Sequence, residues 1–209
     1  GDYRRSLRAF LDAGYAVTGF LPYLDDPQPR HMILRHDIDN SMDLALRMAR
    51  IDAELGARAT FFLRVHARGY NLLSLPCLLQ VQELEAMGHE VELHLDGGLA
   101  HTLGLSERRI ADRQRVIIEE ILGRPIRGFS SHEPSRLGNL EEADELKAAW
   151  GVRYHAYEKR FMMPALKYLS DSSAHWREGH MHGWVGKVDQ LQVLVHPIWW
   201  YEHAPQENQ

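Results

Sequence analysis

The sequence predicts an α/β fold in which parallel strands alternate with helices. Short runs rich in β-branched and aromatic residues recur about every thirty residues along the 209-residue chain, and amphipathic segments separate them. Connections of this length join parallel strands, so the pattern favours βα units arranged as an open sheet or as a barrel. No repeat, linker or low-complexity segment interrupts the series, and we expect one domain covering residues 1–209.

Helices are predicted where apolar residues recur at helical spacing and a stop signal follows. The segments with this pattern are 2–13, 41–55, 76–87, 106–122 and 139–150. The clearest is 41–55, whose apolar residues are spaced by four, three and four positions and which is followed by Gly56. We expect Asn40 or Ser41 to be its N-cap.

The remaining apolar runs predict strands. They lie within residues 32–39, 59–65, 90–94, 126–130, 152–157, 167–170 and 191–195. The third run begins after His89 and ends at His94, and these histidines are five residues apart. Two zinc ligands on one helix would be four apart, so the run is read as a strand on which His89 faces away from Glu90, Glu92 and His94.

Composition excludes several classes of protein. Apolar residues make up 44% of the chain and charged residues 25%, as in ordinary globular proteins, and the formal charge of −5 gives no reason to expect nucleic acid as a partner. No apolar run is long enough to span a membrane, and the first residues lack the apolar core of a signal peptide, so a cytoplasmic location is expected. The single cysteine, Cys77, excludes an intrachain disulfide and a cysteine-rich metal site, whereas thirteen histidines are unusual.

Two carboxylates, Asp37 and Asp39, end the first predicted strand. Side chains two apart on an extended chain face the same way, so both carboxylates can point into one site. One of them can bind a cation while the other accepts a proton from a bound water. The alternative is an Asx-rich turn that caps the following helix.

Further polar residues lie at or just after the ends of the other predicted strands. They are His66, His94, His132, His155, Tyr157, Asp171 and His196. In a parallel α/β barrel the carboxyl ends of all strands meet at one mouth, where such folds carry their active sites. The sequence therefore predicts one polar cluster assembled from residues far apart along the chain.

The motifs HDID, ATFFL, GHEVELH, SDSSAHW and LVHP, read from about residue 31 to 197, resemble the polysaccharide deacetylase family, carbohydrate esterase family 4, with its NodB homology domain. The resemblance implies a distorted (β/α) barrel of about seven parallel strands. It also implies metal-dependent removal of N- or O-acetyl groups from sugars. By this resemblance Asp37 is the catalytic base, Asp39 and His94 are metal ligands and His196 is the general acid.

The chain departs from the family pattern at the third ligand. Gly98 stands where the second motif usually has another histidine, so His101 and His132 are the candidates for the third ligand. We favour His132, because a position directly after a strand is held better than one beyond a Gly-Gly loop. The third motif usually carries an arginine followed by prolines, and residues 130–132, Ser-Ser-His, stand there instead.

The fourth motif, SDSSAHW, also departs from the family pattern. Asp171 and Trp176 are five residues apart; Asp171 is a candidate for orienting His196 or an arginine, and Trp176 for walling the acyl pocket. Both, together with His101, are candidate substrate-binding residues. The simpler explanations are an Asx turn and a core tryptophan.

The chemistry expected of these residues is that of a hydrolytic metal centre. Two imidazoles and a carboxylate leave positions open on a divalent ion, and zinc is the expected metal. The principal hypothesis is a metal-dependent hydrolase that removes an acetyl group from an N-acetylated sugar or sugar-containing precursor, in cell-surface polysaccharide or lipopolysaccharide biosynthesis. The rivals are a metal-dependent C–N hydrolase of a non-sugar small molecule and a non-catalytic glycan-binding relative.

Overall fold

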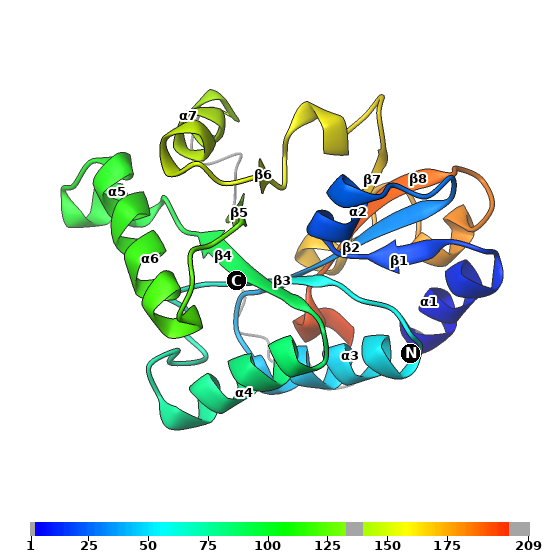
Figure 1. Ribbon diagram of the computed structural model, residues 1–209, viewed down its shortest axis with the longest axis horizontal. Coiled ribbons are helices and arrows are strands. Elements are labelled where there is room, and N and C mark those ends of the chain that lie inside the picture. The colour runs from blue at the N-terminus through cyan, green and yellow to red at the C-terminus, as the bar shows by residue number, and fades with distance from the viewer. Residues whose placement is uncertain (1–2, 133–139, 201–209) are drawn as a thin grey trace.

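The strands form one curled, all-parallel sheet in a computed structural model that describes residues 3–132 and 140–200 (Figure 1). The order across the sheet is β6-β5-β4-β3-β2-β8-β7, and β1 pairs with β2 beside this path. The strands are β1 (Ala16–Thr18), β2 (His31–Ile38), β3 (Thr60–Leu63), β4 (Glu90–Leu95), β5 (Gly128–Ser131), β6 (Tyr154–His155), β7 (Lys167–Ser170) and β8 (Gln190–Val195). The predicted α/β fold, a distorted barrel of parallel strands, is confirmed.

The helices are α1 (Tyr3–Asp12), α2 (Phe20–Asp25), α3 (Met42–Glu54), α4 (Leu75–Ala86), α5 (Leu99–Leu103), α6 (Glu107–Leu122) and α7 (Leu140–Trp150). Helices α3 and α4 lie side by side along one flank of the sheet, and α6 packs beside β4 (Figure 1). In residues 3–132 and 140–200 no helix combines the length and the apolar character needed to cross a membrane.

The predicted helices and strands are present to within a few residues. Ser41 is the N-cap of α3, since its hydroxyl accepts a hydrogen bond from the Leu44 N–H at 3.3 Å. The first residues of the predicted 2–13 and 139–150 helices, Asp2 and Asn139, lie outside the described residues. Elements β1, α2 and α5 were not predicted, because elements of three, six and five residues are too short to show a period.

Strand β2 is the centre of the sheet. All eight of its residues are buried; β8 pairs with one edge, while β1 and then β3 pair along the other. Alternation sends its side chains to two different cores. Met32, Leu34 and Ile38 join the apolar cluster under the outer helices, and Ile33 joins a smaller cluster that contains Phe62.

Because every strand is parallel to β2, the carboxyl ends of the strands lie at one edge of the curled sheet. Ile33 is on the same face of β2 as Arg35 and Asp37, so this face changes from apolar to charged toward that edge. His36 points the other way, where its Nε2 lies 2.9 Å from Asp52 Oδ2, and the Tyr3 hydroxyl donates to the same carboxylate. His36 therefore anchors β2 to α3 and α1 and does not reach the mouth.

The amino-terminal end of the barrel buries an acidic side chain, Glu90. Its carboxylate accepts hydrogen bonds from the Leu21 N–H at 3.0 Å and from the Thr60 hydroxyl at 2.7 Å, so it caps the start of α2. Burial raises the pKa of Glu90 to about 7, although the hydrogen bond from Thr60 acts to lower it. The folded state therefore favours the protonated acid.

This pKa predicts how stability depends on pH. A folded pKa above the unfolded value means that Glu90 favours folding below about pH 4.5 and that this contribution is lost as the pH rises through about 7, by roughly 3 kcal/mol in all. The Glu90→Gln variant lacks this loss, so its advantage over the wild type in free energy of unfolding grows between pH 4.5 and pH 8. Urea unfolding at both pH values measures it. Glu83→Gln, on the surface of α4, is the control, and an equal trend in both variants would contradict the assignment.

Candidate metal centre

Three side chains from three different strand ends meet at the mouth of the barrel. Asp39 follows β2, His94 lies in β4 and His132 follows β5, and their ligand atoms all lie within 4.8 Å of one another. The His132 Nδ1 atom is 3.3 Å from His94 Nε2 and 3.2 Å from Asp39 Oδ1, and His94 Nε2 is 3.6 Å from the same oxygen. We call these three residues the ligand triangle.

The size of the ligand triangle fits a tetrahedral metal ion. Atoms about 2.0–2.2 Å from a tetrahedral ion lie about 3.3–3.6 Å from one another, and the three edges of 3.2, 3.3 and 3.6 Å are within about 0.1 Å of this range. Asp39 Oδ1 is buried and accepts no hydrogen bond of good geometry among the described residues, although both imidazoles are near it. A buried oxygen of this kind, facing two imidazole nitrogens, is suited to a cation.

Contacts with backbone carbonyl groups position the two histidines of the ligand triangle. His94 Nδ1 lies 3.3 Å from the Ser130 carbonyl, which leaves Nε2 to face the triangle, and the His132 N–H donates to the Leu95 carbonyl at 2.8 Å. Burial lowers the pKa of His94, and the carboxylates of Asp37 and Asp39 act against this. Burial would raise the pKa of Asp39, but His132 and His94 lower it below its usual value. A neutral imidazole and an ionised carboxylate are the forms that bind metals.

Asp37 is held beside the ligand triangle by a buried arginine. Arg35 Nε donates to Asp37 Oδ1 at 2.8 Å and Arg35 Nη2 to Oδ2 at 2.7 Å, and both side chains are almost completely buried. Asp37 Oδ2 is 3.4 Å from His94 Nε2. Burial would raise the pKa of Asp37, but the Arg35 guanidinium holds it below its usual value, with help from His94.

Arg35 itself is enclosed by the barrel interior. Its guanidinium donates to the Ser130 hydroxyl, to the Tyr157 hydroxyl at 3.1 Å and to Gln192 Oε1 at 3.3 Å, and it lies over the rings of Phe62 and Tyr157. Sequence reasoning missed Arg35. The only signal was a charged residue within an apolar strand, two positions before Asp37 and therefore on the same face.

His196, which follows β8, lies next to Asp39 of the ligand triangle. Its Nε2 is 3.8 Å from Asp39 Oδ2, and its Nδ1 is 2.6 Å from Asp171 Oδ1. Asp171 also accepts the His196 N–H, at 3.0 Å to Oδ1, and the Trp200 indole N–H at 2.8 Å. Burial would lower the pKa of His196, but Asp171 raises it to about 9, so the imidazole is protonated at neutral pH.

The other predicted residues lie elsewhere. His101 is exposed on α5, and no contact joins it to the ligand triangle in the described part of the chain. Trp176 is half-buried, with its ring 6.3 Å from that of Trp200. His66 is exposed in the loop after β3, whereas His155 is buried and lies 2.9 Å from Asp144.

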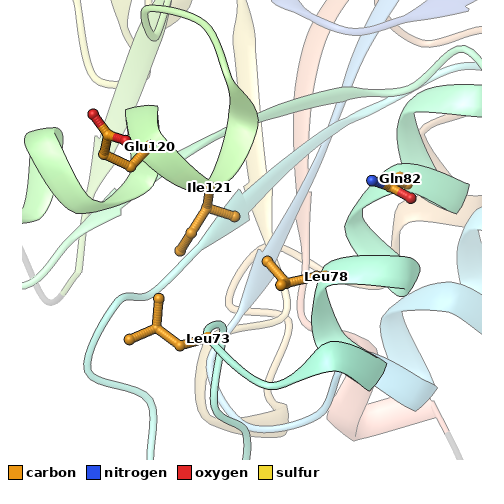
Figure 2. Close-up of a pocket in the computed structure, with 5 residues that line it drawn as sticks. All are labelled: Leu73, Leu78, Gln82, Glu120 and Ile121. Carbon is orange, nitrogen blue, oxygen red and sulfur yellow. The ribbon is translucent and has the colours of Figure 1, made fainter.

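A hollow on the outer surface does not belong to this site. It has a volume of about 350 Å³ and lies between α4 and α6. Figure 2 shows the side chains that line it: Leu73, Leu78, Gln82, Glu120 and Ile121. Glu120 is the one metal-ligating side chain type among these five lining residues.

Comparison with known proteins gives matches only among solved structures: no family model and no curated protein matches the sequence. A carbohydrate esterase family 4 pseudoenzyme from Bacillus anthracis, as a mutant with restored enzymatic activity, matches with a TM-score of 0.55 at 16% identity, over 83% of this chain and 62% of its own. The chitin deacetylase of the fungal pathogen Colletotrichum lindemuthianum matches at 0.53 and 15% identity, over 88% of this chain and 78% of its own. A deacetylase from Streptococcus pyogenes in complex with acetate matches at 0.54 and 12% identity, over 93% and 80%.

These similarities show a shared fold. The chain spans less than two thirds of the length of the first of these structures. The fold implied by the sequence motifs is thus the one found, that of the family 4 carbohydrate esterases.

The ligand triangle predicts which histidine matters for metal binding. The His132→Ala variant is expected to bind zinc at least about 100-fold more weakly than the wild type, because one of three ligands is lost and changes to residues around the ligands alone typically cost about 10- to 100-fold, whereas His101→Ala is expected to bind it unchanged. Competition with a zinc-binding dye measures both affinities, and thermal unfolding without metal checks the fold. Weakened binding in His101→Ala with normal binding in His132→Ala would make His101 the third ligand.

Proposed function

We propose that this chain, which has the fold of the family 4 carbohydrate esterases, is a metal-dependent hydrolase that removes an acetyl group from an N-acetylated sugar. One observation carries the proposal: Asp39, His94 and His132 form a triangle of the size that a tetrahedral ion requires, and both Asp37 and His196 border it. Three protein ligands leave a position for water or substrate, which is the pattern of catalytic rather than structural zinc sites.

Asp37 is proposed as the general base. A divalent ion bound by the ligand triangle would supply an acidified water and a polarised acyl carbonyl. Asp37 is kept ionised by Arg35, and its Oδ2 atom lies 3.4 Å from His94 Nε2, at the edge of the triangle. A carboxylate that accepts hydrogen bonds at both oxygens keeps one orientation, so Asp37 stays beside the ligand triangle.

His196 is proposed as the general acid. Expelling an amine from a tetrahedral intermediate requires a proton on the departing nitrogen. His196 is protonated at neutral pH because Asp171 accepts a hydrogen bond from its Nδ1 and raises its pKa to about 9. Its Nε2 atom lies 3.8 Å from Asp39 Oδ2 and is directed at the mouth, where a leaving group can accept the proton.

The substrate class is proposed from the same site and from the proteins that share the fold. Two of them are named as a chitin deacetylase and as a deacetylase bound to acetate. We place the substrate of this chain among the N-acetylated sugars of cell-surface polysaccharide or lipopolysaccharide biosynthesis. The substrates of the assay described below show whether this chain acts on a sugar precursor or on an assembled polymer.

A non-catalytic glycan-binding role is the second candidate, because one structure with this fold is a pseudoenzyme. Two features favour catalysis. The carboxylate of Asp37 is fixed beside the ligand triangle, and the imidazole of His196 is held protonated by a buried carboxylate. A binding module has no need for either.

Acetate release tests the proposal. The wild type with zinc is assayed on N-acetylglucosamine oligosaccharides, on N-acetylated sugar nucleotides and on cyclic amides. We expect acetate from at least one sugar substrate, a loss of about 10²- to 10⁴-fold in Asp37→Asn and a comparable loss in His196→Gln, because each removes one proton-transfer group. Asp26→Asn, an exposed aspartate in the turn after α2, is the matched control and is expected to keep full activity.

The alternatives give different results in the same assay. Ring opening of cyclic amides without acetate release would favour the non-sugar hydrolase. Sugar binding that is unaffected by a chelator and by Asp37→Asn, with no acetate from any substrate, would favour the glycan-binding role.

A further inference from the structure

Arg64 and Asp96 form an ion pair next to the candidate ligand Asp39. Arg64, after β3, contacts Asp96 Oδ2 through its Nη2 atom, and its Nη1 atom is 3.8 Å from Asp39 Oδ1. The Arg64 and Asp96 side chains are only 16% and 11% exposed. The oxygen that faces the imidazoles of His94 and His132 therefore also faces a guanidinium.

The Arg64–Asp96 pair is fixed in position from both sides. The Asp96 N–H donates to Gln114 Oε1 at 2.9 Å, and Gln114 Nε2 donates to the Asp96 carbonyl at 2.8 Å. The Arg64 N–H donates to the Tyr70 hydroxyl at 2.9 Å, and that hydroxyl donates to the Ile38 carbonyl at 2.7 Å. The loop after β3 is thus tied to the residue that precedes Asp39.

The guanidinium of Arg64 has donors left over. Its Nε atom is buried without a hydrogen-bond partner among the described residues, and its Nη1 has only the long contact to Asp39. Asp96 holds it through Nη2 alone. A buried cation with unused donors, next to a buried carboxylate oxygen that accepts no good hydrogen bond, is drawn toward that oxygen.

We propose that the Arg64–Asp96 pair sets the affinity of the ligand triangle for its metal ion. Arg64 competes with the metal for Asp39 Oδ1, and Asp96 limits this competition by holding the guanidinium back. The inference rests on the proposed metal site. It adds a tuning element, supplied by residues that are not ligands.

The sign of each effect follows from charge. Removing Arg64 removes a cation that repels the metal and leaves Asp96 as an added negative charge, so metal binding tightens. Removing the charge of Asp96 frees Arg64 to pair with Asp39, so metal binding weakens. Such effects are strong here because the pair is largely buried and poorly screened by water. Changes in residues around metal ligands typically alter affinity by about 10- to 100-fold.

The test measures zinc affinity by dye competition in Arg64→Met, Asp96→Asn and the double variant. We expect Arg64→Met to bind zinc about tenfold or more tightly than the wild type, Asp96→Asn about tenfold or more weakly, and the double variant to lie near the wild type. Thermal unfolding without metal checks each fold. Arg64→Gln replaces Arg64→Met if the latter does not fold, and it carries the same expected direction.

A second ion pair provides matched controls. Arg50 on α3 and Glu83 on α4 are 2.7 Å apart on the surface, so Arg50→Met and Glu83→Gln make the same changes of net charge away from the site. Both are expected to leave zinc affinity unchanged, and a shift in these variants equal to that at Arg64 and Asp96 would overturn the proposal.

The outcomes separate this inference from the proposed function. If the wild type binds zinc but Arg64→Met and Asp96→Asn shift its affinity in the same direction, or not at all, the tuning role is wrong and the metal site stands. If the wild type binds no zinc, the metal site fails, and the tuning role fails with it.

Discussion

The buried ion pair between Arg35 and Asp37 is the constraint on which the rest of the site depends. Burying either charge alone in the barrel costs several kcal/mol, so each residue requires the other. Their partnership comes from the strand itself, because residues two apart on β2 face the same way. The pair fixes Asp37 at both oxygens, and Ser130 and Tyr157, from β5 and just after β6, contact the same guanidinium. The central strand thereby links the interior of the barrel to the ligand triangle at its mouth.

The parallel topology of the sheet brings the other residues of the candidate site together. Asp39, His94, His132 and His196 are spread over most of the chain, yet each lies at or after the carboxyl end of a strand, and these ends meet at one edge. Their environments then diverge. The imidazole of His94 is buried between carboxylates and has a lowered pKa, whereas that of His196 is hydrogen-bonded to Asp171 and has a raised one. These two environments fit the proposed roles, a metal ligand for His94 and a general acid for His196.

The fold, and the meeting of Asp37, Asp39, His94, His132 and His196 at one edge of the sheet, could be predicted because both follow from periodicity and strand direction. The third ligand could not be fixed from the sequence, since His101 and His132 both lie in connections whose path depends on tertiary packing. Arg35 and Arg64 were missed for a related reason: a charged residue shows its role only through its partner, and Asp96 is 32 positions from Arg64. The histidine of HDID lies beside a catalytic candidate in sequence, but strand alternation turns His36 outward to Asp52.

Diffraction from crystals grown with zinc, measured on both sides of the zinc absorption edge, tests directly whether the ligand triangle binds a metal ion. We expect one strong anomalous peak, about 2.0–2.2 Å from an Asp39 oxygen, His94 Nε2 and His132 Nδ1, with Asp37 still paired to Arg35. No peak at this position with zinc in excess, or a peak bound by His101 in place of His132, would contradict it.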